Sequence, residues 1–333
     1  MATVLLFGGR SFLGGHICRV LVKRGYRVIL QSTSSAEFQN LADLIPHPAI
    51  EPVVCGLDDP DAIRGLLDRS KFMIYAAIPY SMQSLGRAPQ IQRELRDFDA
   101  TLAVLRSSNV EKSVFVSVSG TVGRVPRGTA DETLTAAADT PRSWGHLKEK
   151  LAAEDIIARH VRDGLRAVIV NPSMCIGEFD TRPSTGEFFR FIALCPFAVM
   201  PAALLNIVDV EDVALGTVLA LEKGRTGRRY ILSGTNTTMG ALIRRIRQLA
   251  GKSMPRLTLR RSMAIPIAYC CEVANLVLRR PKPVIPLLGI ELIEQGSQHL
   301  TSEKAAVDLG FTARDAWAAV DRAYRWYVDH GLL

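Results

Sequence analysis

The chain begins with two hydrophobic patterns of different period. Residues 3–7 (TVLLF) form a short apolar run with no polar face, which is typical of a strand buried on both sides. Residues 12–23 follow a helical period, with apolar side chains on one face and Arg19 and Lys23 on the other. Gly25 predicts the end of this helix. We therefore expect a strand, a tight turn and a helix at the start of the chain.

The same order of strand and helix repeats along the first half of the chain. Amphipathic helices are expected at 90–107 and 147–162. Short apolar strands are expected at 27–31, 50–55, 72–77, 113–118 and 166–171. Strands that alternate with helices predict an α/β fold with a doubly wound parallel Rossmann sheet.

From about residue 175 the pattern becomes irregular and rich in Pro, Gly and Phe. Strand-like runs at 206–210 and 229–232 are expected to return to the sheet. The predicted domains are a Rossmann domain at 1–174 with returning segments at 206–233, a small C-terminal substrate-capping region at 175–205 and 235–305, and a C-terminal helix at 306–333.

Small residues separate the first strand from the first helix, with Gly8, Ser11 and Gly14 spaced three apart. A strand, a glycine turn and a helix N-terminus together favour a phosphate, because the backbone can approach it and unpaired N–H groups and the helix dipole attract its charge. Ser11 stands where a further glycine is expected. We expect a dinucleotide to bind along the whole turn, formed by Gly8, Gly9, Arg10, Ser11, Phe12, Leu13 and Gly14.

The composition is that of a globular enzyme, with 48% hydrophobic and 22% charged residues in a chain of 333. We find neither a secretory signal pattern nor a run of about 18 uncharged apolar residues, so a cytoplasmic protein is expected. The six cysteines include no C-x-x-C pair and are interpreted as reduced thiols. The six histidines lack ligand spacing, so no metal site is expected.

The net charge of +8 is unevenly distributed. Residues 223–282, the basic region, contain 14 Lys or Arg and one acid, Glu272. This region is either a solvated face or a docking surface for an acidic partner, a phosphorylated substrate or a membrane surface. Nucleic acid is disfavoured as a partner, because only Tyr230 and Tyr269 offer aromatic stacking there.

An apolar stretch at 262–278 lies inside the basic region, between Arg260-Arg261 and Arg279-Arg280. It is expected to rest on lipid as an amphipathic helix, to close over an apolar substrate or to form a dimer contact. We expect the protein to be a homodimer.

Longer motifs follow the glycine turn FGGRSFLGGH: IYAA at 74–77, VFVSVSGTVG at 114–123, GTADET at 128–133, VNPSMCIGEFDTRPSTG at 170–186, NIVDVEDVALG at 206–216, LEKGRTGRRYILSGTN at 221–236 and WYVDHG at 326–331. Together they resemble the extended short-chain dehydrogenase/reductases, or NAD-dependent epimerase/dehydratase family. They look closest to its dihydroflavonol-reductase-like branch, which includes hopanoid-associated sugar epimerases. The resemblance implies an NAD(P)-binding oxidoreductase.

The resemblance also implies roles for single residues. Ser119 stands in the place of the family's catalytic serine, with Ser117 as the alternative. Cofactor contacts beyond the glycine turn are implied for Ala76, Ala77, Lys150, Pro172 and Ser173.

The family's active site uses a tyrosine and a lysine one helical turn apart. The lysine lowers the pKa of the tyrosine, which passes a proton while hydride moves. The segment SWGHLKEKLAAE at 143–154 holds no tyrosine in any register. One alignment places Lys150 on the lysine and His146 on the tyrosine, where an imidazole that titrates near neutrality is a replacement acid or base. Another places Leu147 there after a deletion, and Trp144 with Lys148 also has the right spacing.

The end of the second strand bears on the choice of cofactor. Gln31 is followed by hydroxyl residues at 32–35, with neither the acid that holds the ribose of NAD nor the arginine expected for NADP. The hydroxyls, beginning with Ser32, are suited to accept a 2′-phosphate, with Arg10 or Lys23 beside them. NADP is therefore slightly preferred over NAD.

The expected substrate is an apolar small-molecule ketone or alcohol of secondary metabolism or lipid modification. Residues that either line its pocket or pack the cap are Met174, Cys175, Ile176, Phe188, Phe189, Phe191 and Phe197. Two other functions stay open. The missing tyrosine favours a non-redox isomerase, cyclase or dehydratase, and the basic region favours a non-catalytic nucleotide-sensing protein.

Overall fold

A computed structural model of the chain describes residues 1–33, 38–78, 88–123, 125, 127–136, 145–181, 185–194, 203–253, 266, 270 and 299–333. Within its helices the side chains of 88, 145, 146 and 185–188 are outside this description. Most of the basic region beyond residue 253, including the apolar stretch, is also outside it.

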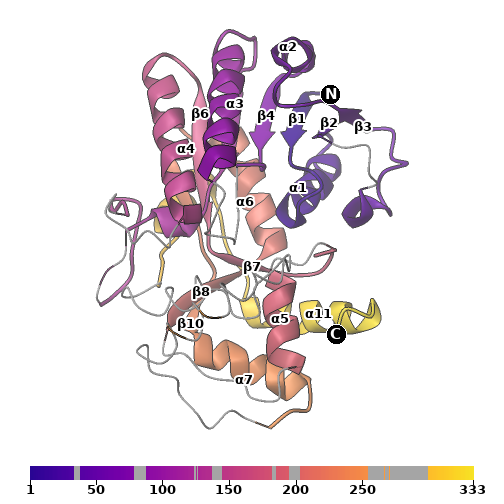
Figure 1. Ribbon diagram of the computed structural model, residues 1–333, viewed down its shortest axis with the longest axis vertical. Coiled ribbons are helices and arrows are strands. Elements are labelled where there is room, and N and C mark those ends of the chain that lie inside the picture. Colours follow the sequence, from indigo (N-terminus) through magenta and orange to yellow (C-terminus); the bar gives the residue numbers. More distant parts are fainter. Residues whose placement is uncertain are drawn as a thin grey trace.

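The larger part of the molecule is built on a seven-stranded parallel sheet, ordered β3-β2-β1-β4-β5-β6-β9 (Figure 1). Its strands are β1 (Thr3–Phe7), β2 (Arg27–Ser32), β3 (Ile50–Val54), β4 (Phe72–Tyr75), β5 (Lys112–Val116), β6 (Ala167–Pro172) and β9 (Arg229–Leu232). The α/β fold expected from the sequence, with a doubly wound parallel Rossmann sheet, is confirmed.

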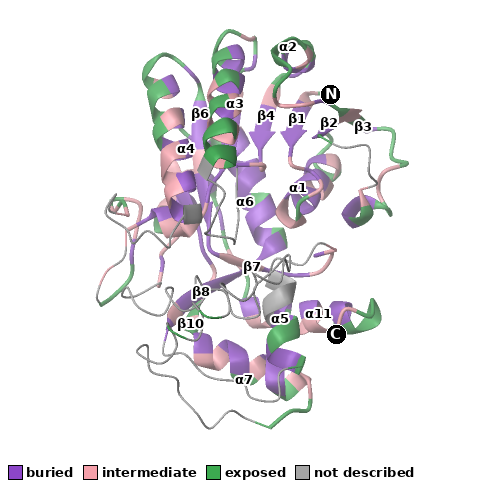
Figure 2. Cartoon of the chain, in the orientation of Figure 1, coloured by how far each residue is buried: buried purple, intermediate pink, exposed green. Residues whose placement is uncertain are grey.

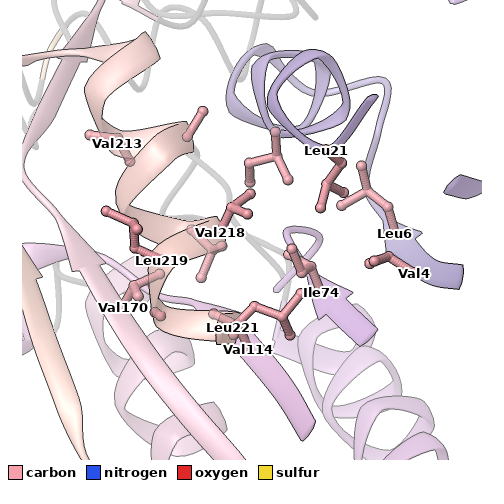
Figure 3. Close-up of a cluster of buried hydrophobic side chains, with 14 of the residues drawn as sticks. Val4, Leu6, Leu21, Ile74, Val114, Val170, Val213, Val218, Leu219 and Leu221 are labelled. Carbon is pink, nitrogen blue, oxygen red and sulfur yellow. The ribbon is translucent and has the colours of Figure 1, made fainter. Parts of the chain in front are cut away.

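Helices cover both faces of this sheet because side chains alternate along each strand. Val4 and Leu6 of β1 belong to the core under α1 (Phe12–Lys23) and α6 (Val210–Lys223), seen in Figure 3. Leu5 and Phe7 belong to the core on the opposite face. That second face is covered by α2 (Pro60–Asp68), α3 (Ala88–Arg106) and α4 (Gly145–Arg162).

A smaller mixed sheet, ordered β10-β8-β7, forms the second part of the molecule. Its strands are β7 (Met174–Ile176), β8 (Leu204–Asp209) and β10 (Thr235–Thr238). Around it lie α5 (Thr185–Leu194), α7 (Met239–Leu249) and α11 (Ala316–Asp329). A separate core of Ile207, Leu242 and Val320 holds these elements together, and Figure 2 shows the buried inner faces of the helices.

Two expectations about the second half of the chain are wrong. The strand expected at 206–210 does not return to the large sheet, because β9 already pairs with the free edge of β6 and β8 pairs with β7 and β10. The single helix expected at 306–333 is two helices, α10 (Glu303–Leu309) and α11. Gly310, at φ +74°, ends α10 in a left-handed conformation, and Phe311 then turns into the core.

Among the described residues, no helix is long and apolar enough to cross a membrane. The same part of the chain contains no group of three or more His, Cys, Asp or Glu arranged to hold a metal ion.

Candidate cofactor and active site

The glycine turn between β1 and α1 is packed too closely for side chains at its key positions. Gly8 has a φ of +83°, and a Cβ on it would lie 2.6 Å from the carbonyl oxygen of Ala76, just beyond β4. A Cβ on Gly14 would overlap the carbonyl oxygen of Gly8. The turn therefore holds bare backbone against the end of β4, which is the cradle a pyrophosphate needs.

Ser11, which replaces a glycine, caps helix α1. Its hydroxyl donates to Gly8 O at 2.7 Å and accepts from Gly14 N at 3.0 Å. The first N–H groups of a helix have no acceptor within it, so those of Phe12 and Leu13 stay available for an anion. Ser11 thus stabilises the start of the helix without occupying the N–H groups that an anion would need.

Asn40 supports the turn from behind and was missed in the sequence. It lies buried in η1 (Gln39–Leu41), and its Nδ2 donates to Gly9 O at 3.0 Å and to Ser11 O at 2.9 Å. A Cβ on Gly15 would overlap this amide. Asn40 lies in a segment with no periodic pattern. The one signal in the sequence was the glycine pair at 14–15, because Gly15 leaves room for a side chain packed against α1.

The other expected cofactor residues lie at strand ends on the same edge of the sheet. Ser32 is buried at the end of β2, and Ala76 and Ala77 follow β4 half-buried. Pro172 is the last residue of β6. The hydroxyl of Ser173, the next residue, donates to Asn206 Oδ1 of β8 at 2.6 Å, and this hydrogen bond joins the two sheets. Residues 34–37 are outside the described chain, so the preference for NADP stays a prediction.

Lys150 reaches the same edge of the sheet from α4, which covers the face opposite to α1. Its side chain is buried, and Nζ donates to the carbonyl oxygen of Ile78 at 2.9 Å. Burial lowers the pKa of Lys150 to about 7, while the carboxylates of Glu154 and Glu149 act in the opposite direction. Both protonation states of Lys150 are therefore populated near neutrality.

Ser119 begins a short turn, η2 (Ser119–Thr121), directly beyond β5. A buried polar cluster holds this turn: Thr121 Oγ1 donates to Glu154 Oε1 at 2.7 Å, and Asn171 Nδ2 donates to the same oxygen at 2.9 Å. Because Glu154 is one helical turn after Lys150, the cluster fixes α4 against η2. This cluster could not be predicted from the sequence, because its members come from three separate segments.

The structure describes only part of the segment 143–154, where the family resemblance implies a tyrosine. His146 lies in the first turn of α4, but its side chain is outside the described atoms, and Trp144 is outside the described residues. Leu147 is buried, and a Cβ on Gly120 would lie 3.2 Å from its Cδ1. An apolar side chain therefore packs beside the turn that carries Ser119.

Five of the seven residues expected either to line an apolar pocket or to pack the cap have side chains that the structure describes. Ile176 and Phe189 are fully buried and belong to the core of the second sheet. Met174 and Cys175 are half-buried in β7, and Phe191 is exposed on α5. Phe197 and the side chain of Phe188 are outside the description.

A doubly wound parallel sheet with a glycine turn between β1 and α1 is typical of dinucleotide-binding α/β proteins. The chain belongs to the NAD-dependent epimerase/dehydratase family, whose family model matches residues 4–233. An NAD(P) cofactor is typical of that family.

Relatives match almost the whole chain. A dihydroflavonol 4-reductase-like protein of Synechocystis sp. is 28% identical over 98% of this chain and 94% of its own length. Sterol demethylase protein B of Methylococcus capsulatus is 25% identical over 99% of this chain and 100% of its own. The crystal structure of the nucleoside-diphosphate-sugar epimerase PA4631 from Pseudomonas aeruginosa has a TM-score of 0.80 and 25% identity, covering 99% of this chain and 98% of that one.

Proposed function

We propose that the protein is an NAD(P)-dependent oxidoreductase that acts on an apolar small-molecule ketone or alcohol. One observation carries the proposal. Gly8 packs on Ala76 and Lys150 binds the carbonyl of Ile78, two residues further along. The phosphate turn and the buried lysine therefore flank the same strand end, so a dinucleotide lying across it would meet both.

The residues present suit a dinucleotide. The backbone of the turn and the start of α1 would hold the pyrophosphate, with Asn40 fixing the turn. Lys150 would hold the ribose hydroxyls next to the nicotinamide, and Ser119 would bond the substrate oxygen. When bound, the cofactor supplies or accepts hydride. We prefer NADP to NAD, because the hydroxyl run beginning at Ser32 lacks an acid.

The names of the relatives support the substrate class. Sterol demethylase protein B and the dihydroflavonol 4-reductase-like protein each match at least 94% of their own length. Sterols and dihydroflavonols are compounds of several rings with large apolar surfaces. A substrate of this kind would bury its rings under the capping region and present one oxygen to the strand ends.

An anaerobic assay with NADPH and a panel of apolar ketones, including sterol ketones, tests the proposal. The absorbance of the reduced nicotinamide is expected to fall by one equivalent for each alcohol formed. Product that forms while this absorbance stays constant contradicts the proposal. Gly65→Ala, on an exposed position of α2 with open space around it, is the matched control for variants of the glycine turn.

A non-redox isomerase, cyclase or dehydratase is the second candidate. The packing of Leu147 beside the Ser119 turn favours it, because no tyrosine occurs anywhere in α4. The same assay separates the two functions, since the second gives product without net oxidation of NADPH. Tight binding of NADPH with no conversion of any substrate would instead favour a nucleotide-sensing protein.

A further inference from the structure

Three consecutive residues beyond β7, namely Glu178, Phe179 and Asp180, form a connecting loop between the two parts of the molecule. The loop lies between α1, whose N-terminus carries the glycine turn, and α11 of the capping region (Figure 1). Phe179 has a φ of +64°, and no other described residue except glycine has a positive φ. This conformation is unfavourable for phenylalanine and persists only where several neighbours hold it. Residues held in this way are concentrated at ligand clamps and switch regions, so we asked what holds Phe179.

Helix α1 holds one side of the connecting loop through two side chains. The buried imidazole of His16 donates from Nε2 to Glu178 O at 2.9 Å. The His16 ring lies edge-on to the rings of Phe12 and Phe179, with centroids 5.5 and 5.9 Å away. The guanidinium of Arg19 stacks on the ring of Phe179 at 4.2 Å from its centroid, a favourable cation–π contact.

These contacts continue to the glycine turn by two routes. In the first, Arg19 Nη2 donates to the carbonyl oxygen of Asn40 at 2.8 Å. The side-chain amide of Asn40 donates to Gly9 O and Ser11 O inside the turn. The second route is the ring of Phe12, whose N–H group stays available for an anion at the start of α1. The backbone geometry that suits a pyrophosphate is therefore tied to the position of the connecting loop.

Helix α11 holds the other side of the connecting loop. The Tyr327 hydroxyl donates to the fully buried carboxylate of Asp180 at 3.0 Å. The ring of Trp326 lies against that of Phe179, with centroids 6.1 Å apart. Trp326 and Tyr327 also belong to the core of the second sheet, where the Tyr327 ring contacts Phe189 of α5 at 5.5 Å. The same loop therefore positions α11 and, through it, the capping region.

We propose, on the basis of the dinucleotide binding in the proposed function, that the connecting loop couples the glycine turn to the cap. A dinucleotide bound at the turn would tighten α11 onto the capping region. The state with Phe179 clamped between Arg19 and Trp326 keeps both the turn and α11 in place. A ligand that binds this state more tightly than a state in which the loop has left the clamp shifts the population toward it. Because such coupling is reciprocal, loosening α11 weakens dinucleotide binding by the same factor.

Calorimetric titration with NADPH tests this reciprocity from the α11 side. Tyr327→Phe removes the hydroxyl that bonds Asp180 and changes no group of the glycine turn. It is expected to weaken NADPH binding about fivefold or more, the lower end of couplings between distinct sites. Arg24→Ala is the matched control on α1, because Arg24 pairs with Glu222 of α6 at the end of α1 away from the turn. We expect this control to bind NADPH as the wild type does.

The ring of Phe179 is tested in the same titration. Phe179→Ala removes the group on which Arg19 and Trp326 pack, and it is expected to weaken NADPH binding about tenfold. Phe179→Tyr keeps the ring and should restore most of the affinity. Urea unfolding without NADPH establishes that each variant is folded. If Phe179→Ala and Tyr327→Phe lower the free energy of unfolding but bind NADPH as tightly as the wild type, the loop is only a structural connection and the inference is wrong.

Hydrogen exchange followed by mass spectrometry measures the coupling in the wild type itself. NADPH is expected to slow exchange in α11 about fivefold more than at residues 99–106, the C-terminal half of α3. This half of α3 precedes β5 and so lies at the edge of the sheet opposite to the glycine turn. In Phe179→Ala the two segments are expected to respond equally.

The outcomes separate the coupling from the proposed function. Equal slowing of α11 and residues 99–106 in the wild type, with NADPH bound, overturns the coupling and leaves dinucleotide binding intact. A wild type that binds neither NADPH nor NADH overturns the proposed function and the coupling together.

Discussion

At the scale of single residues, the glycine turn is defined by atoms that would collide with any side chain. Gly8 faces the Ala76 carbonyl, Gly14 faces Gly8, and Gly15 faces Asn40. The hydroxyl of Ser11 occupies the space that the remaining glycine would leave empty and bonds Gly8 and Gly14. The phosphate site proposed at this turn therefore depends on the backbone more than on any charged group.

Gly8→Ala is expected to weaken NADPH binding by more than about tenfold, equivalent to about 1.4 kcal/mol. The new Cβ would lie 2.6 Å from Ala76 O, and the φ of +83° is unfavourable for alanine. Calorimetric titration of both proteins with NADPH measures the change, with Gly65→Ala as the control that binds normally. Equal affinity of Gly8→Ala and wild type contradicts a pyrophosphate at this turn.

Lys150→Met is expected to stabilise the protein most at low pH. Burial lowers the pKa of Lys150 from 10.5 to about 7, so the unfolded chain binds more protons between those values and the stability of the wild type rises with pH there. Below pH 7 the buried Lys150 lowers the free energy of unfolding by its full amount, on the order of 3–5 kcal/mol. This loss disappears above pH 10.5, where the lysine is neutral in both states. Urea unfolding of both proteins at pH 6, 8 and 10 should show a shrinking difference, and a constant difference would show that the lysine does not titrate in this range.

Some site residues could be predicted from the sequence and others could not. The turn at 8–14 is visible because its spacing coincides with the change from a strand period to a helical period. Asn40 and Glu154 act through contacts with distant segments, and neither has a local pattern. The sequence shows that residues 143–154 contain no tyrosine, but only the packing of Leu147 indicates what lies beside the Ser119 turn.

At the scale of elements, strands and helices with a clear period begin and end within two residues of the predicted bounds. β1 and α1 match residue for residue, because a buried strand, a serine cap and a glycine stop specify both ends. Helix α2 was missed because it has only nine residues, although its Asp59 cap and Pro60 in its first turn are both helix-start signals. β8 was assigned to the wrong sheet, because a strand's own residues do not determine its partner.

Asp209 at the start of α6 is a junction between elements. It caps the helix through Glu211 N at 3.0 Å and pairs with Arg314 at 2.9 Å and Arg322 at 2.5 Å. Asp209→Ala is expected to lower the free energy of unfolding by about 2–3 kcal/mol, because a buried carboxylate and a cap are lost together. Asp315→Ala, an exposed cap of α11, should cost about 1 kcal/mol. Urea unfolding compares them, and equal losses would mean that the pairs of Asp209 contribute nothing.

At the scale of the whole molecule, the described cations of the basic region mostly bind other parts of the protein. Arg229 bonds the carbonyl oxygen of Glu132, Arg245 pairs with Asp321, and Arg247 is buried and bonds Ile192 O. Lys223 donates to Leu309 O. Any docking surface is therefore expected to depend on the arginines beyond residue 253.

The double variant Arg260→Glu/Arg261→Glu is expected to weaken binding to vesicles that contain anionic lipid. Wild-type binding should fall as salt rises from about 50 to 200 mM, because screening shortens the reach of charges. Sedimentation with vesicles measures both effects, and Arg228→Glu, at an exposed position in the described chain, is the control. Binding that is absent, or that does not change with salt, leaves the basic region as a solvated face.

The most direct test of the account follows one atom from cofactor to product. NADPH carrying deuterium at C4 of the nicotinamide, in each of its two stereochemical forms, is given to the enzyme with an apolar ketone, and the alcohol is analysed by mass spectrometry. We expect one deuterium in the product from one form and none from the other, because a cofactor held by the glycine turn and Lys150 presents a single face of its ring. Product formed without deuterium from either form, or without loss of NADPH, would contradict it.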